Sequence, residues 1–152
     1  YKRQGIENAM SKEFYELDET IIKNPEDVDY KRMIEATKEV IKDISDLGKV
    51  LVISRGASAI LKDKENVLRV FFSANEDERV SRAKKMHNLE SDAAAVDLLR
   101  HADHAQNEYF MKAFNLDFSD QSMYHLTLNT SNLTPEECSN IILNLSKNKL
   151  TY

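Results

Sequence analysis

The chain has 152 residues with 21 basic and 26 acidic side chains, which gives a net charge of −5. That length fits one domain with a sizeable core, and the acidic balance argues against general nucleic-acid binding. The single cysteine, Cys138, excludes an internal disulfide bond and a cysteine-based zinc site, and we expect it to pack on a helix. No apolar run approaches the length of a membrane span and no signal-peptide pattern opens the chain, which predicts a soluble, cytoplasmic protein.

Glycine and proline are rare, with three and two residues, and no flexible linker interrupts the sequence. We therefore expect a single domain over residues 1–152. The chain opens on Tyr1-Lys2-Arg3-Gln4 without an initiator methionine, and this opening resembles linker sequence more than native protein. We expect the true N-terminus of the protein to be missing.

The sequence of the first part of the chain indicates two helices, a strand and a short helix. Apolar residues at mostly helical spacing indicate a helix over residues 6–22. A second, amphipathic helix follows Asp27 as N-cap and stops at Gly48. Residues 50–53 are an unbroken apolar run, which is typical of a parallel strand buried on both faces. A short helix over residues 57–61 comes next.

The rest of the chain predicts two more strands and three helices. Residues 67–72 and 124–129 are the strands. Because helical segments separate the strands, we expect parallel pairing and a three-layer α/β fold.

The three later helices have recognisable start signals. Ser73 or Asn75 could cap a helix with acidic residues in its first turn, which would run to about His87. A long polar helix or helix pair is predicted over residues 91–114. The sequence Thr-Pro-Glu-Glu at residues 134–137 is a strong helix start, with a capping threonine, a proline at the first position and a glutamate three residues after the cap.

Ser54, Arg55 and Gly56 follow the first predicted strand directly. Open α/β sheets bind ligands at the carboxyl ends of their strands. Gly56 allows a tight turn and a close approach of the backbone, and Arg55 offers a planar charged fork that suits phosphate or carboxylate. From this local pattern alone, an ordinary surface arginine is an equally good reading of Arg55.

From residue 50 onward, the order of these signals resembles the nucleoside monophosphate kinases, most closely the cytidylate kinase-like family. That family has a strand ending in Gly-Arg-Gly, and Ser54 replaces the first glycine here. Its next strand leads into an acidic helix start and Arg-x-x-Arg, matched by Arg79 and Arg82. Its lid, about residues 79–115 here, carries Asp-x-x-Arg before two aromatic residues, and Asp103 stands at the aspartate. The family's last strand, Tyr-x-Leu-x-Leu-Asn-Thr, matches residues 124–130.

The resemblance implies transfer of a phosphoryl group from ATP to CMP or dCMP, with Mg²⁺ bridging the donor phosphates. By analogy, Arg55 would hold the phosphate of the acceptor beside Ser54 and Gly56. Asp103 would accept hydrogen bonds from the sugar or base of the acceptor. Arg79 and Arg82 would approach the phosphates and neutralise the charge that develops during transfer.

Two departures from the family pattern bear on activity. Gln106 replaces the lid arginine that follows Asp103. No Gly-x-x-x-x-Gly-Lys-Ser/Thr sequence, whose backbone amides and lysine hold the donor phosphates, occurs in the chain. We therefore expect a P-loop kinase-like parallel sheet with the phosphate-loop strand missing, inactive as it stands. Residues 50–53 and 67–72 should then run parallel about 9–10 Å apart, twice the normal strand spacing, with exposed apolar edges.

Other readings remain open. The chain could be a non-catalytic nucleotide-binding or regulatory α/β module, or an α/β interaction protein without a nucleotide. His101 and His104 stand three residues apart and could grip a metal, but a solvated helix face is the favoured reading and we predict no metal site. The aromatic residues at the end of the lid predict a packing cluster rather than a base-stacking platform: Tyr109, Phe110, Phe114 and Phe118.

Overall fold

The computed structural model describes residues 28–149, so the helix predicted over residues 6–22 lies outside the described part. The second predicted helix is confirmed as α2 (Val28–Asp46). Its buried face carries Tyr30, Ile34 and Ile41. The chain leaves the helix through Gly48, whose φ of +66° lies in the left-handed region that glycine adopts without strain.

Residues 50–53 do not form the predicted buried strand, and this expectation was wrong. They belong to neither strand of the sheet, and Leu51 and Ile53 are 85% and 77% exposed. A strand is stable only when a neighbour satisfies its backbone hydrogen bonds, and none of the described strands pairs with this segment. Within residues 28–149, the apolar sequence is therefore present without a strand paired beside it.

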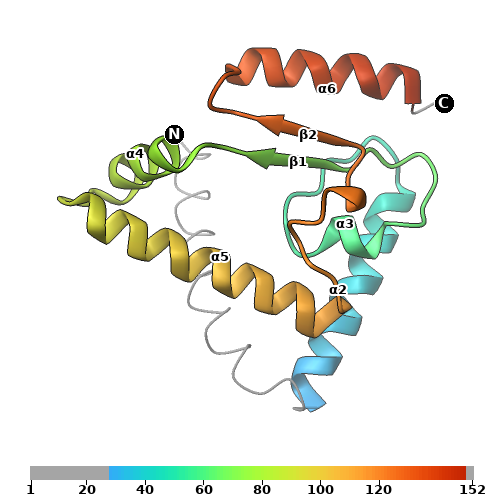
Figure 1. Ribbon diagram of the computed structural model, residues 1–152. Helices are drawn as coiled ribbons and strands as arrows, with labels where there is room; N and C mark the ends of the chain where they lie inside the picture. Colours follow the sequence, from blue (N-terminus) through green and yellow to red (C-terminus); the bar gives the residue numbers. More distant parts are fainter. Residues whose placement is uncertain (1–27, 150–152) are drawn as a thin grey trace, which may run out of the picture.

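The described sheet has two strands, β1 (Val70–Ser73) and β2 (Leu126–Asn129). They pair in parallel, with Val70 opposite Leu126 and Ser73 opposite Asn129, which confirms the predicted pairing of the second and third strands. Both are shorter than predicted at their N-terminal ends. Figure 1 shows the two strands running side by side between α6 and α5. The fold is thus α/β with a small parallel sheet.

The remaining helices follow the predicted order. They are α3 (Ala57–Ile60), α4 (Glu76–His87), α5 (Asp92–Phe114), the 3₁₀ turn η1 (Gln121–Met123) and α6 (Pro135–Lys149). Residues 91–114 form one helix rather than a pair, and Ser91 caps it by accepting a hydrogen bond from Ala94 N–H at 3.2 Å. None of the helices within residues 28–149 is long and apolar enough to cross a membrane.

The predicted start of α6 is confirmed in detail. Thr134 Oγ1 accepts a hydrogen bond from Glu137 N–H at 3.2 Å, and Glu137 Oε2 accepts one from Thr134 N–H at 2.7 Å. This reciprocal pair satisfies two backbone donors at the helix terminus. These hydrogen bonds lower the pKa of the Glu137 carboxyl group below its ordinary value. Cys138, in the next position, is buried on α6 as expected.

The core is small and aromatic, which confirms the predicted packing cluster. Phe110 is 3% exposed, and its ring centroid lies 5.6 Å from that of Phe114 and 6.0 Å from that of Phe118. Phe71 of β1 packs on Tyr124 with ring centroids 4.9 Å apart, which connects the cluster to the sheet. The end of α5 is therefore connected to β1 through the rings of Phe110, Phe118 and Phe71.

Arg69, just before β1, joins three backbone segments around this core. Its Nε–H donates to Met123 O at 2.7 Å, and Nη1 donates to Lys62 O at 2.7 Å. Its backbone N–H donates to His125 Nδ1 at 3.1 Å. These contacts set the relative position of the turn after α3 and the two strands.

Candidate functional site

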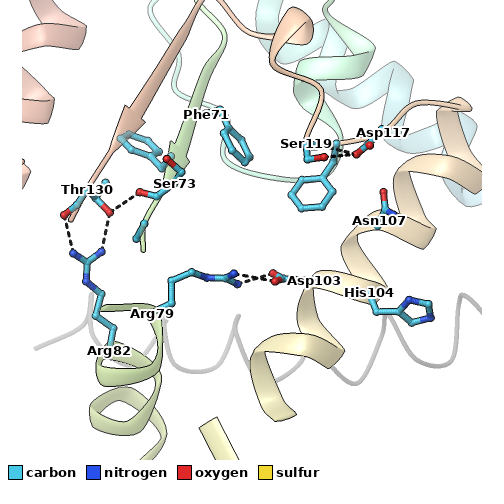
Figure 2. A pocket seen from close by; sticks show the side chains of 13 residues that line it. Phe71, Ser73, Arg79, Arg82, Asp103, His104, Asn107, Asp117, Ser119 and Thr130 are labelled. Carbon is cyan, nitrogen blue, oxygen red and sulfur yellow. Dashed lines mark hydrogen bonds and ion pairs between the residues drawn. The ribbon is translucent and has the colours of Figure 1, made fainter. Parts of the chain in front are cut away.

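A pocket of about 700 Å³ lies where the two strands end. Ser73 and Ala74 from the carboxyl end of β1 and Thr130 from that of β2 form one wall. Helices α4 and α5 and residues 117–119 complete it (Figure 2). The carboxyl edge of a parallel sheet is where ligands bind in open α/β folds, and this volume is within the range of small-molecule sites.

Arg79 of α4 and Asp103 of α5 form a bidentate ion pair in this pocket. Arg79 Nη2 donates to Asp103 Oδ1 at 2.6 Å, and Nη1 donates to Oδ2 at 2.9 Å. The hydrogen bonds to Asp103 raise the pKa of the Arg79 guanidinium above its ordinary value, against the opposing effect of burial. The two side chains are 35% and 49% exposed, so both remain reachable from solvent.

Arg82, one turn further along α4, points to the end of β2 instead. Its Nη1 donates to Thr130 Oγ1 and its Nη2 to Thr130 O, both at 2.8 Å. Its Nε also lies 3.4 Å from Glu78 Oε2. The spacing of three residues places Arg79 and Arg82 on the same side of α4, where both line the pocket (Figure 2).

The pocket wall farthest from Arg82 carries an acid. In Figure 2, Asp117 and Ser119 lie on the side opposite Arg82 and Thr130. Asp117 Oδ1 accepts hydrogen bonds from Ser119 Oγ at 2.7 Å and from Ser119 N–H at 2.8 Å, and these bonds lower the pKa of the Asp117 carboxyl group. One end of the pocket is therefore cationic and the other polar and acidic.

The family model for the cytidylate kinase-like family matches residues 3–132. The chain belongs to the cytidylate kinase-like family. This confirms the resemblance seen in the sequence.

Two relatives and one solved structure show how far the likeness extends. Proteins named cytidylate kinase from Sulfurisphaera tokodaii and Sulfolobus acidocaldarius are 27% identical over 105 residues and 28% identical over 82 residues. These alignments cover 69% and 54% of this chain and 57% and 44% of the relatives, so the chain spans about half the length of the curated relatives that it matches. An uncharacterized protein from Eubacterium ventriosum has the same fold, with a TM-score of 0.70 at 16% identity over 88% of this chain and 81% of its own.

The structure brings together three of the six residues predicted for the site. Arg79, Arg82 and Asp103 line the pocket, although Asp103 contacts Arg79 rather than open space. Ser54, Arg55 and Gly56 are not among its lining residues. Their proposed contacts with substrate stay predictions.

The turn at Gly56 has the tight geometry expected from the sequence. Gly56 has a φ of +70°, and Ser54 and Arg55 also have positive φ values, of 67° and 58°. Tyr109 Oη donates to Arg55 O at 3.3 Å, and the Phe114 ring lies directly over the position where a Cβ on Gly56 would stand. Glycine is thus needed at position 56 because the backbone there lies close to the Phe114 ring of α5.

Sequence reasoning did not single out several lining residues. Thr130 entered only as part of the family motif, and Ser73 only as a possible cap. Both stand at the carboxyl ends of predicted parallel strands, and that position alone is the signal that could have found them. Asn107 lies one turn after Asp103 on the same helix, which is where a second lining residue of α5 is expected.

Residues 28–149 contain no group of three or more histidine, cysteine, aspartate or glutamate side chains that could hold a metal ion. His101 is exposed on α5, and His104 lies 3.9 Å from Glu108 Oε1 on the same helix. The two carboxylates of the pocket have other partners, since Asp103 contacts Arg79 and Asp117 contacts Ser119. In this structure the carboxylates of Asp103 and Asp117 are therefore engaged by protein partners, and the described residues form no preformed cluster of metal ligands.

Proposed function

We propose that the pocket binds CMP or dCMP, as the phosphoryl acceptor of a nucleoside monophosphate kinase that uses ATP. The observation that carries this proposal is the convergence of Arg79, Arg82 and Asp103 on one pocket at the carboxyl edge of the sheet. Membership of the cytidylate kinase-like family supports the acceptor class. The polarity of the pocket supports an orientation with the phosphate at Arg82 and the nucleoside toward Asn107 and Asp117.

The proposed roles follow from charge and geometry. Phosphoryl transfer depends mainly on positioning and on stabilising the charge of the transferred group. Arg82 and Arg79 supply that charge from one face of α4. Asp103 accepts hydrogen bonds from the sugar or base, for which its contact with Arg79 must open or be shared. Arg55, next to Ser54 and Gly56, is proposed as a further ligand of the acceptor phosphate.

We further propose that β1 and β2 belong to a three-layer P-loop kinase-like sheet. The strand that carries the phosphate loop would lie between residues 50–53 and β1. The exposure of Leu51 and Ile53 supports this, because a strand seated beside them would bury apolar side chains that now face solvent. The family implies ATP with Mg²⁺. Because Mg²⁺ in such sites is held largely by substrate phosphates and water, with one or two carboxylates, we assign none of the described residues to it.

The binding proposal predicts that Arg82→Ala weakens CMP affinity. Loss of a charge-assisted hydrogen bond to phosphate should cost about 1.5–3 kcal/mol, a factor of roughly 10–150 in Kd. Titration calorimetry of the 152-residue chain with CMP measures this. Cytidine, which lacks the phosphate, should bind Arg82→Ala and wild type alike.

Two further variants sharpen the test. Arg100→Ala removes an exposed arginine of α5 that does not line the pocket, and it should leave the CMP affinity unchanged. Arg55→Ala tests the residue outside the pocket, and an affinity equal to wild type would remove Arg55 from the site. If CMP binds Arg82→Ala as tightly as wild type, the pocket is not the phosphate site.

The 152-residue chain should show no CMP kinase activity with ATP and Mg²⁺. Its sequence contains no Gly-x-x-x-x-Gly-Lys-Ser/Thr loop, and the described residues offer no substitute for the amides and lysine that hold the donor phosphates. A coupled assay for ADP release measures the rate. Turnover that Arg82→Ala abolishes would contradict this prediction.

A non-catalytic nucleotide-binding module is the second candidate. Two observations favour it, because each leaves less positive charge for a phosphate. Gln106 stands in place of the lid arginine, and the guanidinium of Arg79 is bound by Asp103. The coding sequence ahead of Tyr1 separates the two candidates. An in-frame strand followed by a glycine-rich Lys-Ser/Thr loop supports the kinase, whereas a start codon just before Gly5 supports the non-catalytic module.

A further inference from the structure

Thr130 holds Arg82 through two uncharged oxygens. Arg82 Nη1 donates to the hydroxyl Oγ1 and Nη2 to the carbonyl O, each at 2.8 Å. A guanidinium bound by two acceptors at one edge has a fixed plane and direction. The pair therefore determines where the charge of Arg82 lies in the pocket (Figure 2).

The Thr130 hydroxyl is itself held in one orientation. It donates its proton to Ser73 O at 3.0 Å, and Thr130 N–H donates to the same carbonyl at 2.8 Å. Because a hydroxyl has one proton and two lone pairs, donation to Ser73 leaves a lone pair for Arg82. Thr130 thus connects the ends of both strands to the side chain of α4.

The two arginines of the pocket differ in what binds them. Arg79 is bound by a carboxylate, which partly neutralises its charge for as long as the bidentate contact is made. Arg82 is bound by neutral oxygens, and its contact with Glu78 at 3.4 Å is between side chains that are 47% and 51% exposed. Such a single, exposed contact at this distance is weak, whereas the contact of Arg79 with Asp103 is bidentate and short. Arg82 is therefore the less neutralised of the two arginines.

We propose that Thr130 is a positioning residue that fixes Arg82 for a phosphate group without cancelling its charge. The inference rests on the proposed function, because it assigns Thr130 a task in binding the acceptor phosphate. Thr130 does not need to touch the nucleotide itself. Its side-chain hydroxyl, rather than its size, carries the role.

Two substitutions isolate the hydroxyl. Thr130→Val keeps the shape of the side chain, and the bond from Thr130 N–H to Ser73 O preserves the junction of the strands. Removal of one of two bonds that orient Arg82 should weaken CMP binding about three- to tenfold and leave cytidine binding unchanged. Thr130→Ser restores the hydroxyl and should restore the CMP affinity. Thr127→Val, the same change at an exposed position of β2, is the matched control.

A second readout follows Arg82 directly. In a ¹⁵N spectrum of the ligand-free chain, the guanidinium Nη–H signals of Arg82 should be shifted and broadened by Thr130→Val but not by Thr130→Ser, because only valine removes the hydroxyl that accepts from Nη1. Unchanged signals in Thr130→Val would overturn the positioning role.

The binding outcomes separate this inference from the proposed function. Equal losses for CMP and cytidine in Thr130→Val would show a structural role and overturn the inference alone. The same holds if Arg82→Ala loses CMP affinity while Thr130→Val does not. A wild-type chain that does not prefer CMP to cytidine would overturn both the proposed function and the inference.

Discussion

Phe110→Ala should lower the free energy of unfolding by about 3–5 kcal/mol, the range for large aromatic truncations in cores. Phe110 is 3% exposed and packs with Ala59 and Met123 at the centre of the hydrophobic cluster. Its removal takes the ring contacts with Phe114 and Phe118 away together. A domain of this size has a total stability of about 5–15 kcal/mol, so this one change should remove a large fraction of it.

Guanidinium denaturation followed by circular dichroism measures the loss. Met111→Ala is the matched control, because Met111 is the next residue of α5 and is 46% exposed. It should cost well under 1 kcal/mol, as surface substitutions usually do. Equal losses for the two variants would show that the aromatic cluster is not the centre of the core.

Most helices could be predicted because their signals are local. The start of α6 depends on Thr134 and Glu137, three residues apart, and the structure contains the reciprocal hydrogen bonds that this spacing predicts. The parallel pairing of β1 and β2 could also be predicted, because helical segments lie between the two apolar strands in the sequence. The prediction of a strand at residues 50–53 was wrong because a strand needs a neighbouring strand to pair with. No local sequence pattern tells whether that neighbour is present.

In the candidate site, too, local signals were predictable and contacts between distant residues were not. Arg79, Arg82 and Asp103 could be found because the motif fixes their places relative to a strand end and a helix. Their contacts could not be predicted, because Arg79 is 24 residues from Asp103 and Arg82 is 48 residues from Thr130 in sequence. Which acceptor an arginine selects depends on the packing of α4 against α5 and β2, and that packing is a property of the whole fold.

Gly56→Ala should destabilise the protein more than Gly48→Ala, which serves as its internal standard. Both glycines have left-handed backbones, with φ of +70° and +66°, so an alanine at either position costs about 1–2 kcal/mol in backbone strain. A Cβ at Gly48 would meet nothing within 4 Å. A Cβ at Gly56 would stand 2.5 Å from Phe114 Cζ, which is far closer than van der Waals contact.

The clash at Gly56 should add about 1–3 kcal/mol, the usual cost of overpacking, to the strain that both variants share. The difference between the two unfolding free energies therefore measures the contact with Phe114 alone. In a double-mutant cycle, Phe114→Ala should relieve most of that added cost, because the two residues are in direct contact. If Gly56→Ala and Gly48→Ala cost the same, the Phe114 ring can move aside freely, and the end of α5 does not hold the turn that carries Arg55.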